Sequence, residues 1–252
     1  MNISFISAVV PVVLLLIFIY RKDKYQREPI GKLLLTFFVG CLSVIPAILQ
    51  ETLLMPLAPS AESMPVANGI YTGFVVAGFS EELWKLLLLM WVIWRSPHFD
   101  EYFDGIVYAA YLSLGFACVE NIGYVTGGDD QMLTALMRGL LAVPAHFLFA
   151  VIMGYHLSLA KFDPERRRHL WHALIYPLLM HGTYDALLMV SSNLGGDGDS
   201  LGIVCGVLFI VFIVFDIKMW RWGLKRIKRL QERSKEQGFD RQHPFDGFTW
   251  DI

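Results

Sequence analysis

Long apolar runs alternate with short polar connections along this chain. A run of roughly 20 apolar residues is long enough to cross a bilayer as an α-helix. Seven such runs are expected to span the membrane, at residues 3–20, 33–55, 69–94, 105–125, 133–160, 169–190 and 201–220. The pattern therefore predicts an all-α, polytopic integral membrane protein with about seven transmembrane helices. No basic segment precedes the first run and no clear small-residue cleavage site follows it, so we expect a retained span and not a cleaved signal peptide.

Composition narrows the class of protein further. Of the 252 residues, 55% are hydrophobic, and the net charge is only −2. The mean hydropathy of +0.49 is too high for a soluble domain of this size. The lipid bilayer is thus an expected partner, and nucleic acid is not. All three cysteines lie inside apolar runs, where we expect small buried side chains and no disulfide framework.

Basic residues predict which way the spans run. All Lys and Arg except Lys85 and Arg138 fall on alternate connections or at their edges. The other connections, at 56–68, 126–132 and 191–200, contain none and carry acidic residues instead. Because basic connections mark the cytoplasmic side, we expect a multi-pass cell-membrane protein with its N-terminus outside and its C-terminus in the cytoplasm.

The last part of the chain is strongly basic. The stretch WRWGLKRIKRLQERSK, residues 220–235, intersperses Trp, Leu and Ile with Lys and Arg. This mixture is typical of an amphipathic helix that lies on an anionic membrane surface. We therefore divide the chain into a transmembrane domain, residues 1–220, and a basic amphipathic cytoplasmic tail, residues 221–252.

Several apolar runs also contain ionisable or strongly polar residues, which cost at least about 2.5 kcal/mol each at the centre of a bilayer. They are Glu81, Glu82 and Lys85 in the third run, Glu120 and Asn121 in the fourth, Arg138 and His146 in the fifth, and His181 and Asp185 in the sixth. At 1.5 Å per residue, Glu81 and His146 lie roughly 18–20 Å from the outer ends of their runs, and His181 roughly 14 Å. The group can therefore converge in the middle and outer half of the membrane.

The spacing of these residues suits acid–base chemistry. Glu81 and Glu82 lie four and three residues before Lys85, so both can meet it on one helix face. One ammonium cannot neutralise two carboxylates, which leaves one acid for general acid–base work. His181 and Asp185 are also four apart, and the aspartate can orient the imidazole.

A purely structural interpretation of each pair is also available, because polar side chains hold membrane helices together. We expect Arg138 to reach the headgroups or to pair with Glu120.

Pro144 and Pro177 precede His146 and His181, and proline kinks would open a wet cavity beside each of these two histidines. The remaining histidines are assigned no role: His98, His156, His169 and His172.

Four motifs, in this order on successive runs, resemble the PrsW family. They are E-E-x-x-K (Glu81, Glu82, Lys85), F-x-x-x-E-N (Phe116, Glu120, Asn121), P-x-H (Pro144, His146) and H-x-x-x-D (His181, Asp185). The stretch FDEYFDGIVYAAYLSLGFACVENIGY, residues 99–124, is also similar, although Ala109 stands where the family usually has glycine. The long C-terminal tail is a second departure from the family pattern.

The resemblance implies an all-helical, glutamic-type intramembrane peptidase related to the CAAX-processing and Abi membrane proteins. Family members include a protease that makes the first cut in a membrane-bound anti-sigma factor, so the implied partner is a single-span membrane protein cut near the outer face. Carried over by motif, the residues take two roles. The catalytic candidates are Glu81, Glu82 and His181, with His146 as a second candidate for the histidine role, and the supporting residues are Lys85, Glu120 and Asp185.

Two mechanisms remain open at this stage. In the first, which needs no cofactor, Glu81 or Glu82 activates water while His181 or His146 stabilises the oxyanion and protonates the leaving amine. In the second, a zinc ion is held by two imidazoles and two carboxylates, and a glutamate of the third run acts as base. The four candidate ligands are Glu120, His146, His181 and Asp185, and no H-E-x-x-H motif is present.

Two other classes of function are alternatives to a peptidase. One is a non-catalytic membrane scaffold or chaperone subunit of a protease complex, in which the polar residues pack without water. The other is a transporter or ion site, although the repeats and broken helices typical of transporters are not evident.

Overall fold

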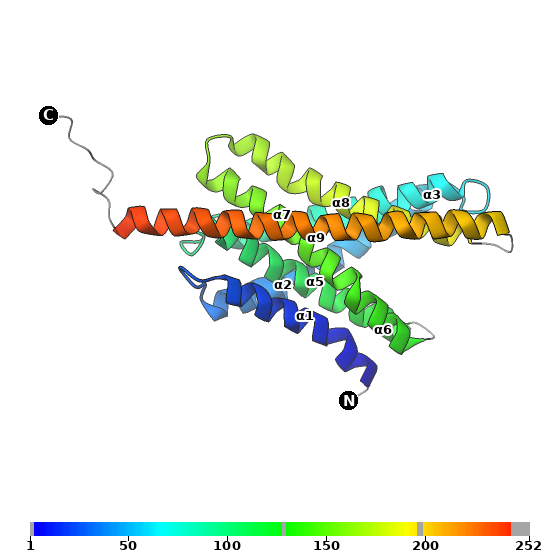
Figure 1. Cartoon of the computed structure of the whole chain (residues 1–252), viewed down its shortest axis with the longest axis horizontal. Coiled ribbons are helices and arrows are strands. Elements are labelled where there is room, and N and C mark those ends of the chain that lie inside the picture. Colours follow the sequence, from blue (N-terminus) through cyan, green and yellow to red (C-terminus); the bar gives the residue numbers. More distant parts are fainter. Residues whose placement is uncertain (1–2, 128–129, 196–198, 243–252) are drawn as a thin grey trace.

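The computed structural model describes residues 3–127, 130–195 and 199–242, and it contains helices and no strand within these ranges (Figure 1). The elements are α1 (Ile3–Lys22), α2 (Ile30–Leu54), the 3₁₀-helix η1 (Met55–Leu57), α3 (Pro65–Tyr71), the π-helix η2 (Thr72–Phe79), α4 (Ser80–Ile93), α5 (Asp104–Gly127), α6 (Gln131–Leu140), α7 (Ala142–Phe162), α8 (Arg166–Leu194) and α9 (Asp199–Gln242). The prediction of an all-α polytopic membrane protein is confirmed.

Six stretches of helix in the described part of the chain are long and apolar enough to cross a membrane. They correspond to six of the seven predicted runs, with α6 and α7 together forming one of them. The third run, residues 69–94, differs because it consists of α3, η2 and α4 in direct succession. None of these three helices has the length of a span by itself. A seventh crossing made by the three together stays a prediction.

Helices α5 and α7 form the centre of the bundle. Nearly every residue of α7 from Val143 to Ala160 is buried, and α5 is buried from Asp104 to Ala117. Small residues allow this burial, because they let helix backbones approach closely. At one such point the Gly105 backbone contacts Gly154. A helix that is apolar on all sides is expected at the core of a bundle, and α1, α2 and α8 pack around this pair.

The fifth predicted run is interrupted at Leu141, between α6 and α7. Pro144 lies in the first turn of α7, where its missing N–H leaves the Leu140 carbonyl without an intrahelical partner. This accounts for a break at that position. Pro177, in contrast, lies inside α8 without ending it.

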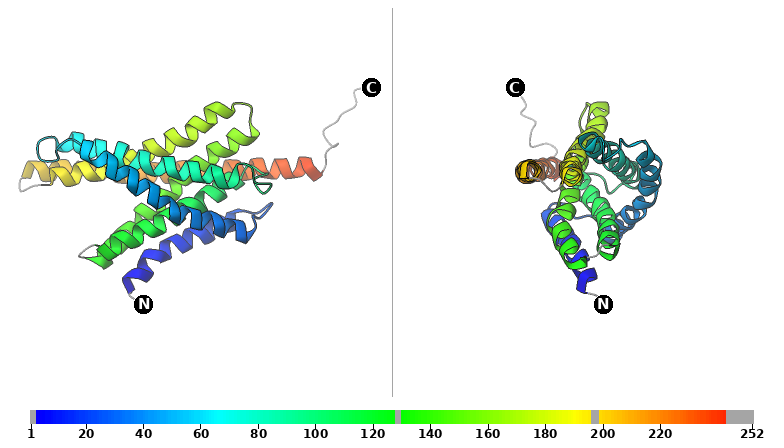
Figure 2. Two further views of the ribbon diagram at one scale, coloured as in Figure 1. Left: turned by 180° about the vertical axis from the view of Figure 1, so that it is seen from behind. Right: turned by 90° about the vertical axis from the view of Figure 1, so that its right-hand side faces the viewer.

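Helix α9 is a single long helix that runs along one side of the bundle (Figure 1), and it is seen nearly end-on in the right-hand view of Figure 2. It continues past residue 220 without a break, and Ile227 and Leu230 in its distal part are buried. The proposed division of the chain at residue 220 and the membrane-surface location of the tail stay predictions. Part of that tail, residues 243–252, lies outside the described residues.

Connections that carry basic residues meet at one end of the bundle. Lys161 Nζ donates to the Trp94 carbonyl at 3.1 Å, and Arg233 of α9 forms an ion pair with Asp163 at 2.8 Å. We call this end, formed by residues 23–29, 94–103 and 163–165, the basic end.

The opposite ends of the helices meet at the other end of the bundle, which we call the acidic end. There Asn193 Nδ2 donates to the Pro65 carbonyl at 3.1 Å, and Tyr71 donates to the Leu54 carbonyl at 3.2 Å. Alternate connections are thus separated, as expected for helices that cross a membrane in alternating directions. Which end faces the cytoplasm stays a prediction.

Two buried carboxyl groups order the connection between α1 and α2 at the basic end. Asp23 accepts a hydrogen bond from the Glu28 backbone nitrogen at 3.0 Å, and Glu28 accepts one from the Tyr108 hydroxyl. Burial raises the pKa of Asp23 to about 6 and the pKa of Glu28 to about 7. Burial disfavours the charged form of an acid, and it is the main cause of both raised pKa values.

Helix η2 packs closely against α8. Because α4 continues η2, this packing fixes α4 relative to α8, and these two helices carry most of the candidate residues. A Cβ atom built on Gly73 would lie 2.6 Å from the Ala186 backbone nitrogen and 2.9 Å from the Gly182 carbonyl oxygen. Only glycine fits at this distance, because backbone atoms cannot move aside as a flexible side chain can. Gly73 therefore helps to set the register between Glu81 and His181.

We expect Gly73→Ala to lower the free energy of unfolding by about 1–3 kcal/mol, the cost of overpacking, and to reduce activity. The matched control is Gly31→Ala, because nothing lies within 4 Å of a Cβ at Gly31. An alanine there should be neutral or stabilising by up to about 1 kcal/mol. Denaturation of both purified variants in detergent micelles measures the difference. Equal stability of Gly73→Ala and wild type would contradict the packing argument.

Candidate active site

A cavity with a volume of about 840 Å³ is lined by most of the ionisable residues found within the apolar runs. Its acidic, arginine and histidine lining residues are Glu51, Glu81, Glu120, Arg138, His146, His181 and Asp185. They come from α2, α4, α5, α6, α7 and α8. Met55 and Gly127 also line it, next to the end of α2 and at the end of α5, so the cavity reaches toward the acidic end.

The two glutamates at the start of α4 occupy different environments. Glu81 lines the cavity, with one carboxylate oxygen 3.9 Å from His181 Nε2 and the other 4.0 Å from His146 Nδ1. Glu82 is fully buried and does not line the cavity. Its Oε1 lies 2.9 Å from His181 Nδ1, and its Oε2 has no hydrogen-bond partner among the described residues. Glu81 can therefore meet a molecule in the cavity, whereas Glu82 lies behind His181.

The π-helix η2 directly precedes α4, the helix that carries both glutamates. Helices η2 and α4 are continuous, and a π-helical turn holds one more residue than an α-helical turn, which rotates the following side chains. Segments of this kind are frequent at functional sites. Here it ends at Phe79, two residues before the first of the two glutamates.

Lys85 joins the acids to one of the histidines. Its Nζ donates to Glu81 Oε2 and to Glu82 Oε1, both at 2.9 Å, and lies 3.1 Å from His146 Nδ1. The Phe116 ring lies under the ammonium at 4.1 Å, in a cation–π contact. The predicted pairing of Lys85 with both acids is therefore confirmed. Lys85 is fully buried, and its ammonium has three polar partners and one aromatic ring around it.

His146 is held by a second set of polar groups on its other side. Its Nε2 lies 2.8 Å from Glu120, which also forms an ion pair with Arg138 at 2.9 Å. Arg138 further donates to Asn121 Oδ1 at 3.1 Å, and Asn121 donates to the Ala8 carbonyl at 2.7 Å. The expected pairing of Arg138 with Glu120 is confirmed, and Asn121 forms hydrogen bonds between helices.

His181 lies between carboxylates on both sides of its ring. Nδ1 faces Glu82, and Nε2 lies 3.1 Å from Asp185, as the i, i+4 spacing predicted. Phe149 stacks on the ring with centroids 4.8 Å apart, and the His146 ring stands perpendicular to it at 5.3 Å. A proton on either nitrogen of His181 therefore has an acceptor, and the stacking fixes the plane of the ring.

The structure thus brings together every residue that the sequence singled out as catalytic or supporting. It adds Glu51, near the end of α2, which lines the same cavity. Sequence reasoning missed this residue because Glu51 lies only a few residues from the end of its run. An acid inside an apolar run was the signal that could have found it.

Four residues could together hold a metal ion, because each offers a donor atom within 4.8 Å of the others: Glu81, Glu82, His146 and His181. Two imidazoles and two carboxylates suit Zn²⁺. This set differs from the one predicted, since Glu120 and Asp185 bond instead to the far nitrogen of each imidazole. Carboxylates commonly occupy that place behind metal-binding histidines. The Lys85 ammonium, however, already contacts three of the four donors.

Comparison with known proteins identifies the family. A family model described as "PrsW family intramembrane metalloprotease" matches residues 28–216, most of the described helices. The chain belongs to the PrsW family. No solved structure matches it.

The similarity to individual PrsW proteins extends over almost the whole chain. A protein named Protease PrsW from Bacillus subtilis (strain 168) is 36% identical over 234 residues, covering 92% of this chain and 97% of that protein. Another of this name, from Clostridioides difficile (strain 630), is 33% identical over 244 residues, covering 93% and 94%. A third, from Geobacillus kaustophilus (strain HTA426), is 35% identical over 236 residues, covering 93% and 95%.

Membership of the PrsW family confirms the resemblance carried by the four motifs. The chain is an intramembrane protease and a multi-pass membrane protein. This favours the peptidase over the scaffold and the transporter. The family description also names a metalloprotease, which keeps the zinc-dependent mechanism in consideration.

Proposed function

We propose that this PrsW protease hydrolyses a peptide bond of a single-span membrane protein near the outer face of the membrane, with Glu81 as the base that activates water. An anti-sigma factor is the substrate class that the family resemblance suggests. The observation that carries the proposal is the position of Glu81, which lines a cavity within 4.0 Å of two imidazoles. A cavity that reaches the acidic end also gives a peptide segment a way in.

In this mechanism each ionisable group has a separate task. Glu81 takes a proton from a water molecule, and the resulting hydroxide attacks the scissile carbonyl carbon. His181 donates a hydrogen bond to the developing oxyanion and then delivers a proton to the leaving amine, after which Glu81 returns its proton to the imidazole. Glu82 holds Nδ1 of His181 in place, and the Nε2–H, which lies 3.1 Å from Asp185 in the free protein, turns from Asp185 to the substrate. His146 is a positioning residue, linking Lys85 to Glu120.

The experiment that tests the activity is co-expression with candidate single-span membrane proteins, including an anti-sigma factor. We expect wild type to release a soluble outer fragment that is absent when Glu81→Gln is expressed instead. Release of the same fragment by both proteins would exclude Glu81 as the base.

A zinc-dependent version of the same reaction is the second candidate, favoured by the donor set and by the family description. The residues that would hold the ion are Glu81, Glu82, His146 and His181. When bound, Zn²⁺ would polarise the carbonyl and lower the pKa of a bound water molecule. Lys85 would have to leave the position between these donors, and for that reason we place the metal-free mechanism first.

Chelation separates the two versions. We expect EDTA treatment followed by dialysis to leave the cleavage rate unchanged, because the Lys85 ammonium already lies between the donors that an ion would need. The measurement is cleavage of a purified substrate before and after chelation, with added Mg²⁺ as a control for nonspecific effects. Loss of activity on chelation, restored by Zn²⁺ and not by Mg²⁺, would establish the zinc-dependent mechanism instead.

We further propose that the basic end faces the cytoplasm, with the N-terminus outside. Reporter fusions test this topology, since an enzyme such as alkaline phosphatase is active only outside. Fusions after Ser60, Gly128 or Gly195 should be active, and fusions after Arg168 or Gln237 should be inactive. The reverse pattern would put the cavity on the cytoplasmic side and remove the support for cleavage near the outer face.

A further inference from the structure

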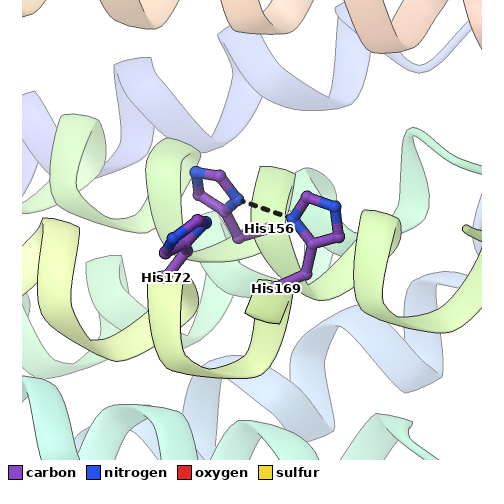
Figure 3. A group of neighbouring side chains, drawn as sticks. All are labelled: His156, His169 and His172. Atoms are coloured by element: carbon purple, nitrogen blue, oxygen red, sulfur yellow. Dashed lines mark hydrogen bonds between the residues drawn. The ribbon is translucent and has the colours of Figure 1, made fainter. Parts of the chain in front are cut away.

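A cluster of three histidines lies outside the cavity just described. His156 of α7 faces His169 and His172, which are three residues apart in the first turns of α8 (Figure 3). His156 follows His146 by ten residues on the same helix, which places it roughly 15 Å away toward the basic end. None of the three lines the cavity. The cluster is therefore separate from the candidate active site.

The geometry of the cluster resembles a set of metal ligands. One nitrogen from each ring lies within 4.8 Å of the other two, and the Nδ1 atoms of His156 and His169 are 3.3 Å apart. Two nitrogens bound to one tetrahedral Zn²⁺ at 2.0–2.1 Å lie about 3.3 Å from each other. The rings of His169 and His172 project from one helix face, as i, i+3 residues do. Each of the three rings therefore offers one nitrogen near a common point.

The hydrogen bonding of His156 supports this interpretation. The side chain is buried, and its ring nitrogen Nδ1 is bonded only to the imidazole of His169. Its Nε2 has no partner in the described part of the chain. Buried polar atoms are normally satisfied, so an imidazole with neither nitrogen held by a carboxylate or backbone group is available to ligate a metal.

The surroundings restrict the kind of metal. Tyr176 stacks on His172 with ring centroids 4.7 Å apart and also contacts His156, so the site is largely aromatic. Three neutral imidazoles without a carboxylate ligand suit Zn²⁺ and other late first-row ions, whereas Mg²⁺ and Ca²⁺ require oxygen ligands. Arg226 lies near this group, over the Tyr155 ring at 4.7 Å. Its charge opposes a cation and lowers affinity, without blocking the imidazole nitrogens.

We propose that His156, His169 and His172 form a zinc site that joins α7 to α8 at the basic end, with the fourth coordination position open to water. The site is independent of the catalytic mechanism. It stabilises the hairpin of α7 and α8, which carries both histidines of the cavity. An ion that binds the folded state and not the unfolded state stabilises the fold, and the melting temperature rises with the logarithm of the free ion concentration above Kd.

The test uses the purified full-length protein in detergent micelles, stripped of metal and titrated with Zn²⁺. At a free concentration 100-fold above Kd, we expect the melting temperature to rise by about 5–10 °C. The double variant His169→Asn/His172→Asn should lose this rise and one equivalent of bound Zn²⁺. The matched control is His98→Asn, an exposed histidine at the same end, which should keep both.

Two further measurements separate this site from the cavity and from misfolding. The variant His146→Asn/His181→Asn should keep the zinc-dependent rise, because it leaves the cluster intact. Substitution with Co²⁺ should give tetrahedral absorption bands in wild type that the single variant His172→Asn lacks. Two results would overturn the proposal. One is that His169→Asn/His172→Asn keeps the full equivalent of zinc, and the other is that only His146→Asn/His181→Asn loses that equivalent.

Discussion

Glu81→Gln is expected to abolish substrate cleavage, with a loss of at least about 100-fold, the lower range for a general base. The glutamine keeps the shape of the side chain but cannot accept a proton from water. Glu81 is also the acid of α4 that lines the cavity. Because the substitution removes one of two acids paired with a single ammonium, the fold should be as stable as wild type or more stable.

Glu82→Gln is expected to have a smaller effect on rate, because this residue acts through His181. The amide can still accept a hydrogen bond from the ring, so part of the activity should remain. Glu62→Gln, in an exposed connection, is the matched control and should cleave at the wild-type rate. Cleavage rates and melting temperatures in micelles distinguish the three variants. A larger loss of rate in Glu82→Gln than in Glu81→Gln would assign the base to Glu82.

Lys85→Met is expected to cost about 3–5 kcal/mol of unfolding free energy, the usual cost of removing one partner from a buried ion pair. The methionine fills a similar volume but leaves Glu81 and Glu82 adjacent without a cation. It also removes the contact with His146 and the cation–π contact with Phe116. Activity should be lost together with stability. Lys24→Met, an exposed lysine in the connection after α1, should change neither.

A double variant tests whether charge is the cause. Glu82→Gln/Lys85→Met removes one acid together with the ammonium, so it should recover part of the lost stability. It should remain inactive, because the arrangement of Glu81 and His146 depends on the ammonium. Chemical denaturation in micelles measures the first effect and the cleavage assay the second. Lys85→Met with wild-type stability would contradict the described ion pairs.

The sequence by itself determined the membrane architecture, since long apolar runs can satisfy their backbone hydrogen bonds in a bilayer only as helices. It also marked most of the candidate residues that meet in the cavity, because an ionisable group inside such a run is costly. The pairings of Lys85 with the two acids and of His181 with Asp185 followed from the 3.6-residue period of one helix. These are local rules, so they hold wherever the helix lies.

Only the tertiary structure separated Glu81 from Glu82, since adjacent residues of a helix differ only in what packs against each of them. It likewise decided that Glu120 and Asp185 bond to the far side of each imidazole, and that Glu51 reaches the cavity. These outcomes depend on the relative positions of helices far apart in sequence.

The meeting of the three histidines at the basic end also could not be predicted from the sequence. Residues 156 and 169 are separated by the connection between α7 and α8, and no sequence motif links them. They meet because α7 and α8 form an antiparallel hairpin (Figure 1), and all three residues lie near its turn. Spacing along the chain fixes the contacts within one helix. Contacts between helices depend instead on the packing angle and rotation of each helix. Small residues such as Gly73 and Gly154 set these by letting helix backbones approach closely.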